Sequence, residues 1–158
     1  MRAIVYFVLM QALAGQIGAA RAQDGRPARI VSANLCADQL LLALGEPDSI
    51  VSLSVLASDP ALSPAAQAAR RYPANRGTGE EIVRLNADLA LIGAYDAPFT
   101  RALLAEKSVP TFALAPWSSL EEGRAQIRAL AERLGRSDRG ERLVADIDAA
   151  ATRAKGAA

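Results

Sequence analysis

The chain has 158 residues, a formal net charge of +1, one cysteine and no histidine. The lack of histidine excludes Ser-His-Asp and Cys-His nucleophiles and histidine-ligated metal sites, and one cysteine excludes an intrachain disulfide. The near-zero charge argues against a nucleic-acid binder, whereas a hydrophobic content of 51% is that of a folded domain of ordinary size.

The first 22 residues have the pattern of a secretory signal peptide. One positive charge precedes an apolar run over residues 3–10, and residues 20–22 (Ala-Arg-Ala) form a small-x-small cleavage site before Gln23. The run is short for a membrane span, which needs about 20 residues. A buried N-terminal helix and a single membrane anchor are the alternatives. We therefore expect export to the periplasm and a mature chain that begins at Gln23.

Short β-forming runs alternate with helical patterns along the rest of the chain. Strands are expected at residues 29–33, 49–53, 88–93 and 109–114. Helices are expected at residues 35–44 and 64–71, from 78 to about 85, at 96–107, at 118–134 and from 137 onward. The helix caps are assigned to Asn34, Thr78, Asp96, Ser118 and Ser119. This alternation predicts an α/β, Rossmann-like lobe with four main parallel strands and right-handed crossovers.

The scarce aromatic and polar residues gather where these strands end. Ligands of such sheets bind beyond the carboxyl ends of the strands. Asn34 follows the first strand, Tyr95 the third and Trp117 the fourth, and Arg76 leads into the helix that Thr78 opens. The two aromatic side chains could also pack a loop against a helix, and Asn34 is first of all a helix cap, so packing and ligand binding both stay open. We expect Tyr95 and Trp117 to share one open surface.

Several segments, taken in order, resemble the substrate-binding proteins of ABC importers for iron siderophores, haem and cobalamin. Residues 29–45 read RIVSANLCADQLLLALG, similar to that family's R-I-V-S-L strand, polar turn and helix ending in A-L-G. Residues 81–91, EIVRLNADLAL, look like its E-x-I-x-x-L-x-P-D-L-V stretch. Residues 109–112 and 118–122 are similar to its G-I-P-V strand and its S-L-E-E helix start. The resemblance extends from about Arg29 to Ile147.

The resemblance implies two α/β lobes that are joined by one long helix and hold the ligand between them. Residues 23–136 would form the N-terminal ligand-binding lobe, and residues 137–158 the start of the lobe-linking helix. The second lobe is absent from this sequence, which indicates a fragment or a truncated gene. The implied function is that of a binding protein, not an enzyme. It binds a metal chelate, above all a ferric siderophore, in the periplasm and delivers it to an ABC permease.

The resemblance also implies roles for single residues. Arg76 and Tyr95 resemble the Arg and Tyr of hydroxamate-siderophore binders, where an Arg donates to the charged oxygens and a Tyr stacks and forms a hydrogen bond. Trp117 lies where a lobe of this family can present an aromatic wall. Asn34 joins the expected ligand-binding set from its place after the first strand, not from the resemblance. No cofactor, catalytic residue or protein-bound metal is expected.

Permease docking and ligand identity stay open at this point. The family docks through an acidic residue, usually a Glu on the helix after the third strand, where this chain has Thr100; Asp96 is the nearest substitute. A haem- or cobalamin-binding member of the same family is the first alternative. The second alternative is a secreted α/β enzyme with its active site at the same strand ends. The chain lacks histidine and a paired nucleophile, which counts against this alternative.

Overall fold

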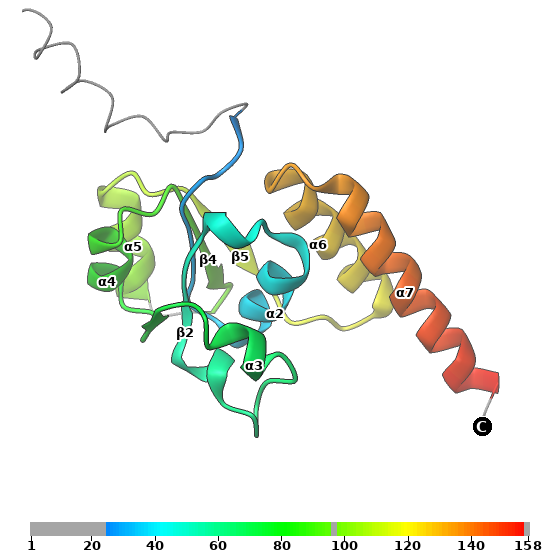
Figure 1. The fold of residues 1–158 in the computed structure, drawn as a ribbon. Helices are drawn as coiled ribbons and strands as arrows, with labels where there is room; N and C mark the ends of the chain where they lie inside the picture. The colour runs from blue at the N-terminus through cyan, green and yellow to red at the C-terminus, as the bar shows by residue number, and fades with distance from the viewer. Residues whose placement is uncertain (1–24, 96–97, 157–158) are drawn as a thin grey trace, which may run out of the picture.

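A computed structural model describes residues 25–95 and 98–156 as one parallel sheet flanked by helices (Figure 1). The sheet order is β3-β2-β1-β4-β5, and all neighbouring strands pair in parallel. The strands are β1 (Ile30–Ser32), β2 (Ile50–Ser54), β3 (Ala74–Asn75), β4 (Leu89–Gly93) and β5 (Thr111–Leu114). The expectation of a Rossmann-like α/β lobe is therefore confirmed.

The helices follow the strands in alternation. They are α2 (Leu35–Leu44), α3 (Ala66–Ala69), α4 (Gly79–Arg84), α5 (Pro98–Glu106), α6 (Leu120–Arg133) and α7 (Ser137–Gly156), with 3₁₀ turns η2 (Pro47–Ser49) and η3 (Val55–Ser58). Local signals set several ends. The Asn34 side chain accepts from the backbone N–H of Cys36 and Ala37 at the start of α2, and Gly135, at φ 66°, follows α6.

The core has one part on each face of the sheet. On one face, α2, α6 and α7 cover buried side chains that include Leu41, Leu91 and Leu130. On the other, α4 and α5 cover Val31, Ile92 and neighbouring apolar residues. Figure 1 shows α4 and α5 on one side of the strands and α2, α6 and α7 on the other. The adjacent strands β1 and β4 are buried along their whole length and form the centre of the sheet and of the core.

The sheet has five strands where the sequence predicts four main ones. The additional strand is β3, whose two residues pair with Leu53 and Ser54 at the end of β2. A two-residue strand with one exposed Ala and one Asn carries no alternating apolar pattern. It forms because the buried Asn75 side chain bonds to groups of β1 and β2, as described below.

The first half of α7 belongs to the lobe, and its second half extends away from it. Val144 is buried, and Leu143 and Ile147 are partly buried against the core. Arg128 of α6 pairs with Glu141 of α7 at 2.8 Å. Residues 149–156 are exposed apart from the half-buried Ala151, and α7 projects past the sheet in Figure 1.

Two expectations lie outside the described residues. They are the signal peptide over residues 1–22, and Asp96 both as a helix cap and as the docking residue. Within residues 25–95 and 98–156, no helix combines the length and the apolar character needed to cross a membrane.

Candidate functional site

The loops that follow the strands meet at one edge of the sheet because all the strands are parallel. Asn34 follows β1, Arg76 follows β3, Tyr95 follows β4, and Trp117 lies in the loop after β5. The four predicted ligand-binding residues therefore all lie along this carboxyl edge, although they are up to 83 positions apart (117 − 34) in the sequence. The two halves of the edge differ in chemistry.

The half around β1, β2 and β3 is tied together by Asn75. Its side chain is 2% exposed. The Nδ2 amide lies 2.9 Å from the carbonyl of Ser32, 2.8 Å from Ser52 Oγ and 2.9 Å from the carbonyl of Leu53. Its Oδ1 accepts from the backbone N–H of Gly77 at 2.9 Å. One buried carboxamide thus joins three strands and the loop after β3.

A buried carboxylate lies in the same half. Asp38, in the first turn of α2, has no exposed surface. It accepts hydrogen bonds from the backbone N–H of Ser54, at 3.1 Å, and from the Ser54 hydroxyl at the end of β2. Desolvation by burial raises the pKa of Asp38, against the lowering effect of hydrogen bonds from Ser32 and Ser54.

Arg76 is exposed, and its loop is fastened through the backbone. Its N–H donates to the Glu81 carboxylate at 2.7 Å, while Thr78 Oγ1 accepts from the Glu81 N–H at 3.3 Å. Thr78 therefore caps α4 as predicted. The Glu81 side chain, however, bonds to the backbone N–H of Arg76 and not to that of Thr78, as it would in a complete capping box. Gly77, at φ 76°, lies so near Ala33 that a Cβ would approach the Ala33 carbonyl to 3.1 Å.

The half around β4 and β5 is apolar and hollowed. The larger pocket, of about 460 Å³, is lined by Cys36, Gln39, Leu40, Leu114, Ala115, Pro116, Trp117 and Gln126. A smaller neighbour, of about 160 Å³, is lined by Asn34, Cys36, Gly93, Ala94, Tyr95, Leu114, Ala115 and Pro116. The two share Cys36 and the segment 114–116. Among the described residues of both linings, none carries a charge.

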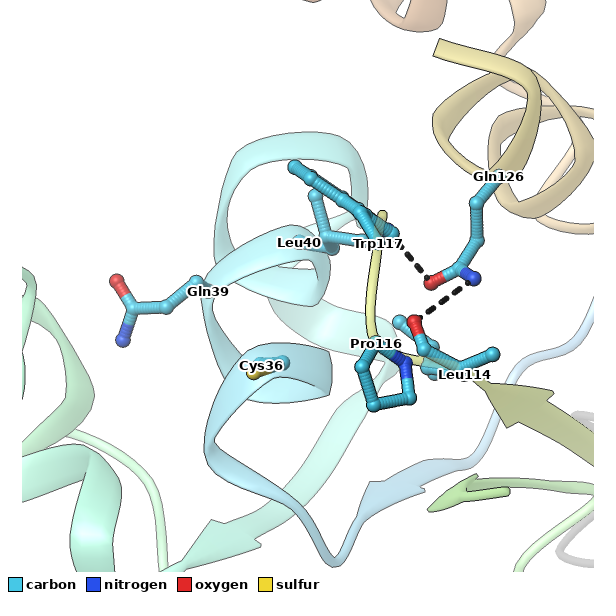
Figure 2. A pocket seen from close by; sticks show the side chains of 8 residues that line it. Cys36, Gln39, Leu40, Leu114, Pro116, Trp117 and Gln126 are labelled. Carbon is cyan, nitrogen blue, oxygen red and sulfur yellow. Dashed lines mark hydrogen bonds between the residues drawn. The ribbon is translucent and has the colours of Figure 1, made fainter. Parts of the chain in front are cut away.

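Trp117 forms one wall of the larger pocket, as Figure 2 shows. Its side chain is 44% exposed. The indole Nε1–H donates to Gln126 Oε1 at 3.2 Å, and Gln126 Nε2 donates to the carbonyl of Ala115 at 3.2 Å. The six-membered ring lies against Gly123 of α6, where a Cβ would come within 2.7 Å of Cε3.

The loop that carries Trp117 is also fixed at the start of α6. Ser119 is the helix cap and accepts from the Glu122 N–H. The Glu122 carboxylate accepts from the backbone N–H of Ser118 at 2.7 Å and from its hydroxyl at 2.8 Å. These bonds, the backbone one first, lower the pKa of Glu122. Ser118 therefore lies before the helix and does not cap it.

The structure brings three of the four predicted ligand-binding residues to the pockets. Asn34 and Tyr95 line the smaller pocket, with Tyr95 84% exposed, and Trp117 lines the larger one. Arg76 is in neither lining. Thr100, which was compared above with the expected acidic docking position, is 9% exposed and packs against Gly79.

The sequence analysis missed Gly123 and Gln126, which position Trp117. A signal was present, since Gly123 is a glycine inside a helix, a place where it is unfavourable unless a neighbour comes close. Cys36 and Gln39, on the exposed side of α2, were also not assigned to the site. In the described ranges, no group of three or more His, Cys, Asp or Glu side chains could hold a metal ion.

Comparison with known proteins identifies the fold family. The sequence model described as "Periplasmic binding protein" matches residues 30–158. A sequence search of curated proteins finds no match.

Three solved structures illustrate the likeness. A periplasmic haem-binding protein from Roseiflexus sp. RS-1 is 32% identical, with a TM-score of 0.64, over 77% of this chain and 46% of its own. A vitamin B12-binding protein of Vibrio cholerae is 25% identical, with a TM-score of 0.60, over 76% of this chain and 46% of its own. A periplasmic haem-binding protein from Pseudomonas aeruginosa is 22% identical, with a TM-score of 0.68, over 80% of this chain and 45% of its own.

This chain therefore spans less than half the length of each of these three proteins. Because the family match covers most of the sequence and agrees with the parallel sheet and its loops, the chain belongs to the periplasmic binding protein family, a family of binding proteins.

Proposed function

We propose that the protein is the substrate-binding component of an ABC importer and binds a metal chelate at the carboxyl edge of its sheet. The pair of adjoining uncharged pockets between α2, the β4 loop and the β5 loop carries this proposal. Pockets of some hundreds of Å³, mostly apolar and with a few polar groups, are typical small-molecule sites. Asn34, Tyr95 and Trp117 contact the ligand, and Arg76 reaches its outer part.

The lining favours binding over catalysis. Acid–base and nucleophilic reactions need a titratable group next to the reacting atom, with a partner that activates it. Of the described lining residues, only Cys36 carries a thiol and only Tyr95 a phenol, and neither has a charged neighbour in the linings. We therefore propose that the chain performs no reaction on its ligand.

Ligand and location complete the proposal. The ligand is a ferric siderophore, a haem or a cobalamin; the similar proteins described above are named for haem and vitamin B12. The protein works in the periplasm after removal of residues 1–22 and delivers its chelate to a permease in the inner membrane. Asp96 is the proposed docking residue.

Fluorescence of Trp117 tests the function directly, because it is the only tryptophan. Haemin, cyanocobalamin and a ferric trihydroxamate are titrated into the chain, with Trp117→Phe as the blank. We expect saturable quenching by one of them, weaker than nanomolar because much of the ligand stays in water on a chain of this length. Lack of saturable quenching by all three, or turnover of a chelate, contradicts the proposal.

A further inference from the structure

Resting on the proposed function, we infer that the larger pocket takes the flat, apolar face of a metalloporphyrin and not an open-chain hydroxamate chelate. We also infer that Gly123 and Gln126 hold Trp117 as a fixed wall for this face. Gly123 and Gln126 are thus positioning residues, which act through Trp117.

The chemistry of the lining separates the two ligand classes. Hydroxamate oxygens carry negative charge and are held best by charged or free N–H donors. The larger pocket offers carbon surface from Leu40, Leu114 and Pro116. No charged residue belongs to its lining among the residues that the structure describes. Such a surface favours a ligand that buries an apolar face.

The two carboxamides of the lining are already engaged within the protein. Gln39 Nε2 donates to Ser63 Oγ at 2.8 Å, and Figure 2 shows the Gln39 side chain pointing away from Trp117. Gln126 bonds to Trp117 through Oε1 and to the Ala115 carbonyl through Nε2. Arg76, the residue expected to bind hydroxamate oxygens, lines neither pocket.

The wall itself is flat and held in place. Gly123 lets the indole approach α6, since a Cβ there would lie 2.7 Å from Cε3 and 2.9 Å from Cδ2. Gln126 joins the indole to the backbone of its own loop. Aromatic rings gain most from offset-stacked or edge-to-face contacts, which a planar ligand can make on a fixed ring. A wall held before binding also lowers the entropic cost of association.

The test compares haemin with the ferric complex of desferrioxamine B on the chain as it stands. Haemin binding is read from its Soret band and from Trp117 quenching. We expect haemin to bind about tenfold or more tightly than the hydroxamate complex, because the described lining residues offer apolar contact to a porphyrin face and no charged donor to hydroxamate oxygens. Gly123→Ala is expected to weaken haemin binding by about tenfold, the scale of one lost aromatic contact.

Gly156→Ala is the matched control, because nothing lies within 4 Å of a Cβ at this exposed helical position. It should leave haemin binding unchanged. A ligand-free signature adds to the test. In Gly123→Ala and in Gln126→Leu, Trp117 emission should shift to longer wavelength and its anisotropy should fall. Gln126→Glu keeps an acceptor for the indole N–H and should restore part of the anisotropy.

Each result has one meaning. Tighter binding of the hydroxamate complex, or of cyanocobalamin, overturns this inference and leaves the proposed function standing. Equal haemin affinity in Gly123→Ala and the unsubstituted chain overturns the fixed wall. If no chelate binds, both proposals fall. Should Gly123→Ala not fold, as seen by circular dichroism, Gln126→Leu decides the role of the wall.

Discussion

The two halves of the carboxyl edge differ in how they use their side chains. Around β1, β2 and β3, polar groups are buried and bonded to one another, with Asn75 and Asp38 at the centre. Around β4 and β5, apolar groups are left open to solvent, with Trp117 and Tyr95 at the rim. The hydrogen bonds of the polar half join β1, β2 and β3, and none of these strands, all of them within the described residues, lines either pocket. The apolar half forms the pockets.

This division has a physical reason. Buried polar groups are costly unless all their hydrogen bonds are made, so a satisfied network tolerates little change. An exposed apolar wall costs little in stability and is available to a ligand. We therefore expect substitutions in the polar half to reduce stability, and substitutions in the apolar half to reduce binding.

Asn75→Ala should have the largest effect. It leaves the Ser32 carbonyl and the Gly77 N–H without their partner and removes the tie to β3. We expect a loss of about 3 kcal/mol in the free energy of unfolding, from more than one buried unsatisfied group. Urea unfolding followed by far-UV circular dichroism measures it. The exposed Gln67→Ala should change stability by less than about 0.5 kcal/mol. If Asn75→Ala changes the free energy of unfolding as little as Gln67→Ala does, the Asn75 hydrogen bonds do not stabilise the fold as proposed.

Asp38→Ala comes next and has a pH signature. The loss of the acceptor for the Ser54 N–H and hydroxyl should cost about 2 kcal/mol. Burial raises the pKa of Asp38 above its unfolded value, so its stabilising contribution is full below the unfolded pKa and declines as pH rises through the folded one. The cost of Asp38→Ala should therefore be greatest at acidic pH.

Urea unfolding across this pH range checks the sign for Asp38. Asp38→Asn is the control, because it keeps one acceptor oxygen and cannot titrate. The stability difference between the unsubstituted chain and Asp38→Asn should shrink as pH rises. A difference that grows with pH would show that the carboxylate is the favoured form in the fold.

Trp117→Ala should act on binding more than on folding. Since the indole is 44% exposed, its truncation should cost about 2 kcal/mol of stability, less than Asn75→Ala. Chelate binding should fall by a larger factor than in any variant of the polar half that stays folded. Isothermal calorimetry gives the affinity, and urea unfolding gives the stability. A stability loss above that of Asn75→Ala would erase the contrast between the halves.

Glu122→Gln should have the smallest effect, with a pH dependence opposite to that of Asp38. Hydrogen bonds from Ser118 lower the pKa of Glu122, so its contribution is present above the unfolded pKa and lost as pH falls through the folded one. The difference between Glu122→Gln and the unsubstituted chain should vanish at acidic pH. Thermal melts at several pH values measure it, and a difference that persists at acidic pH counts against the Ser118 bonds.

Much of the fold could be predicted because its signals are local. A cap such as Asn34 acts on N–H groups two and three residues further on, and a glycine such as Gly135 ends a helix through its own φ. A short apolar run such as Leu89–Gly93 of β4 indicates a buried strand without reference to any distant part of the chain. Alternation then implied parallel strands, and parallel strands implied that Asn34, Arg76, Tyr95 and Trp117 follow one edge.

The tertiary structure alone decided which residues meet at that edge. Asn75 bonds to Ser32 across 43 positions, and β3 exists because of such partners. Asp38 resembles an exposed first-turn carboxylate until β2 packs on it. Gly123 and Gln126 matter only because the β5 loop lays Trp117 on α6. Burial and shape depend on segments distant in the sequence, so local patterns place the edge and long-range packing forms its pockets.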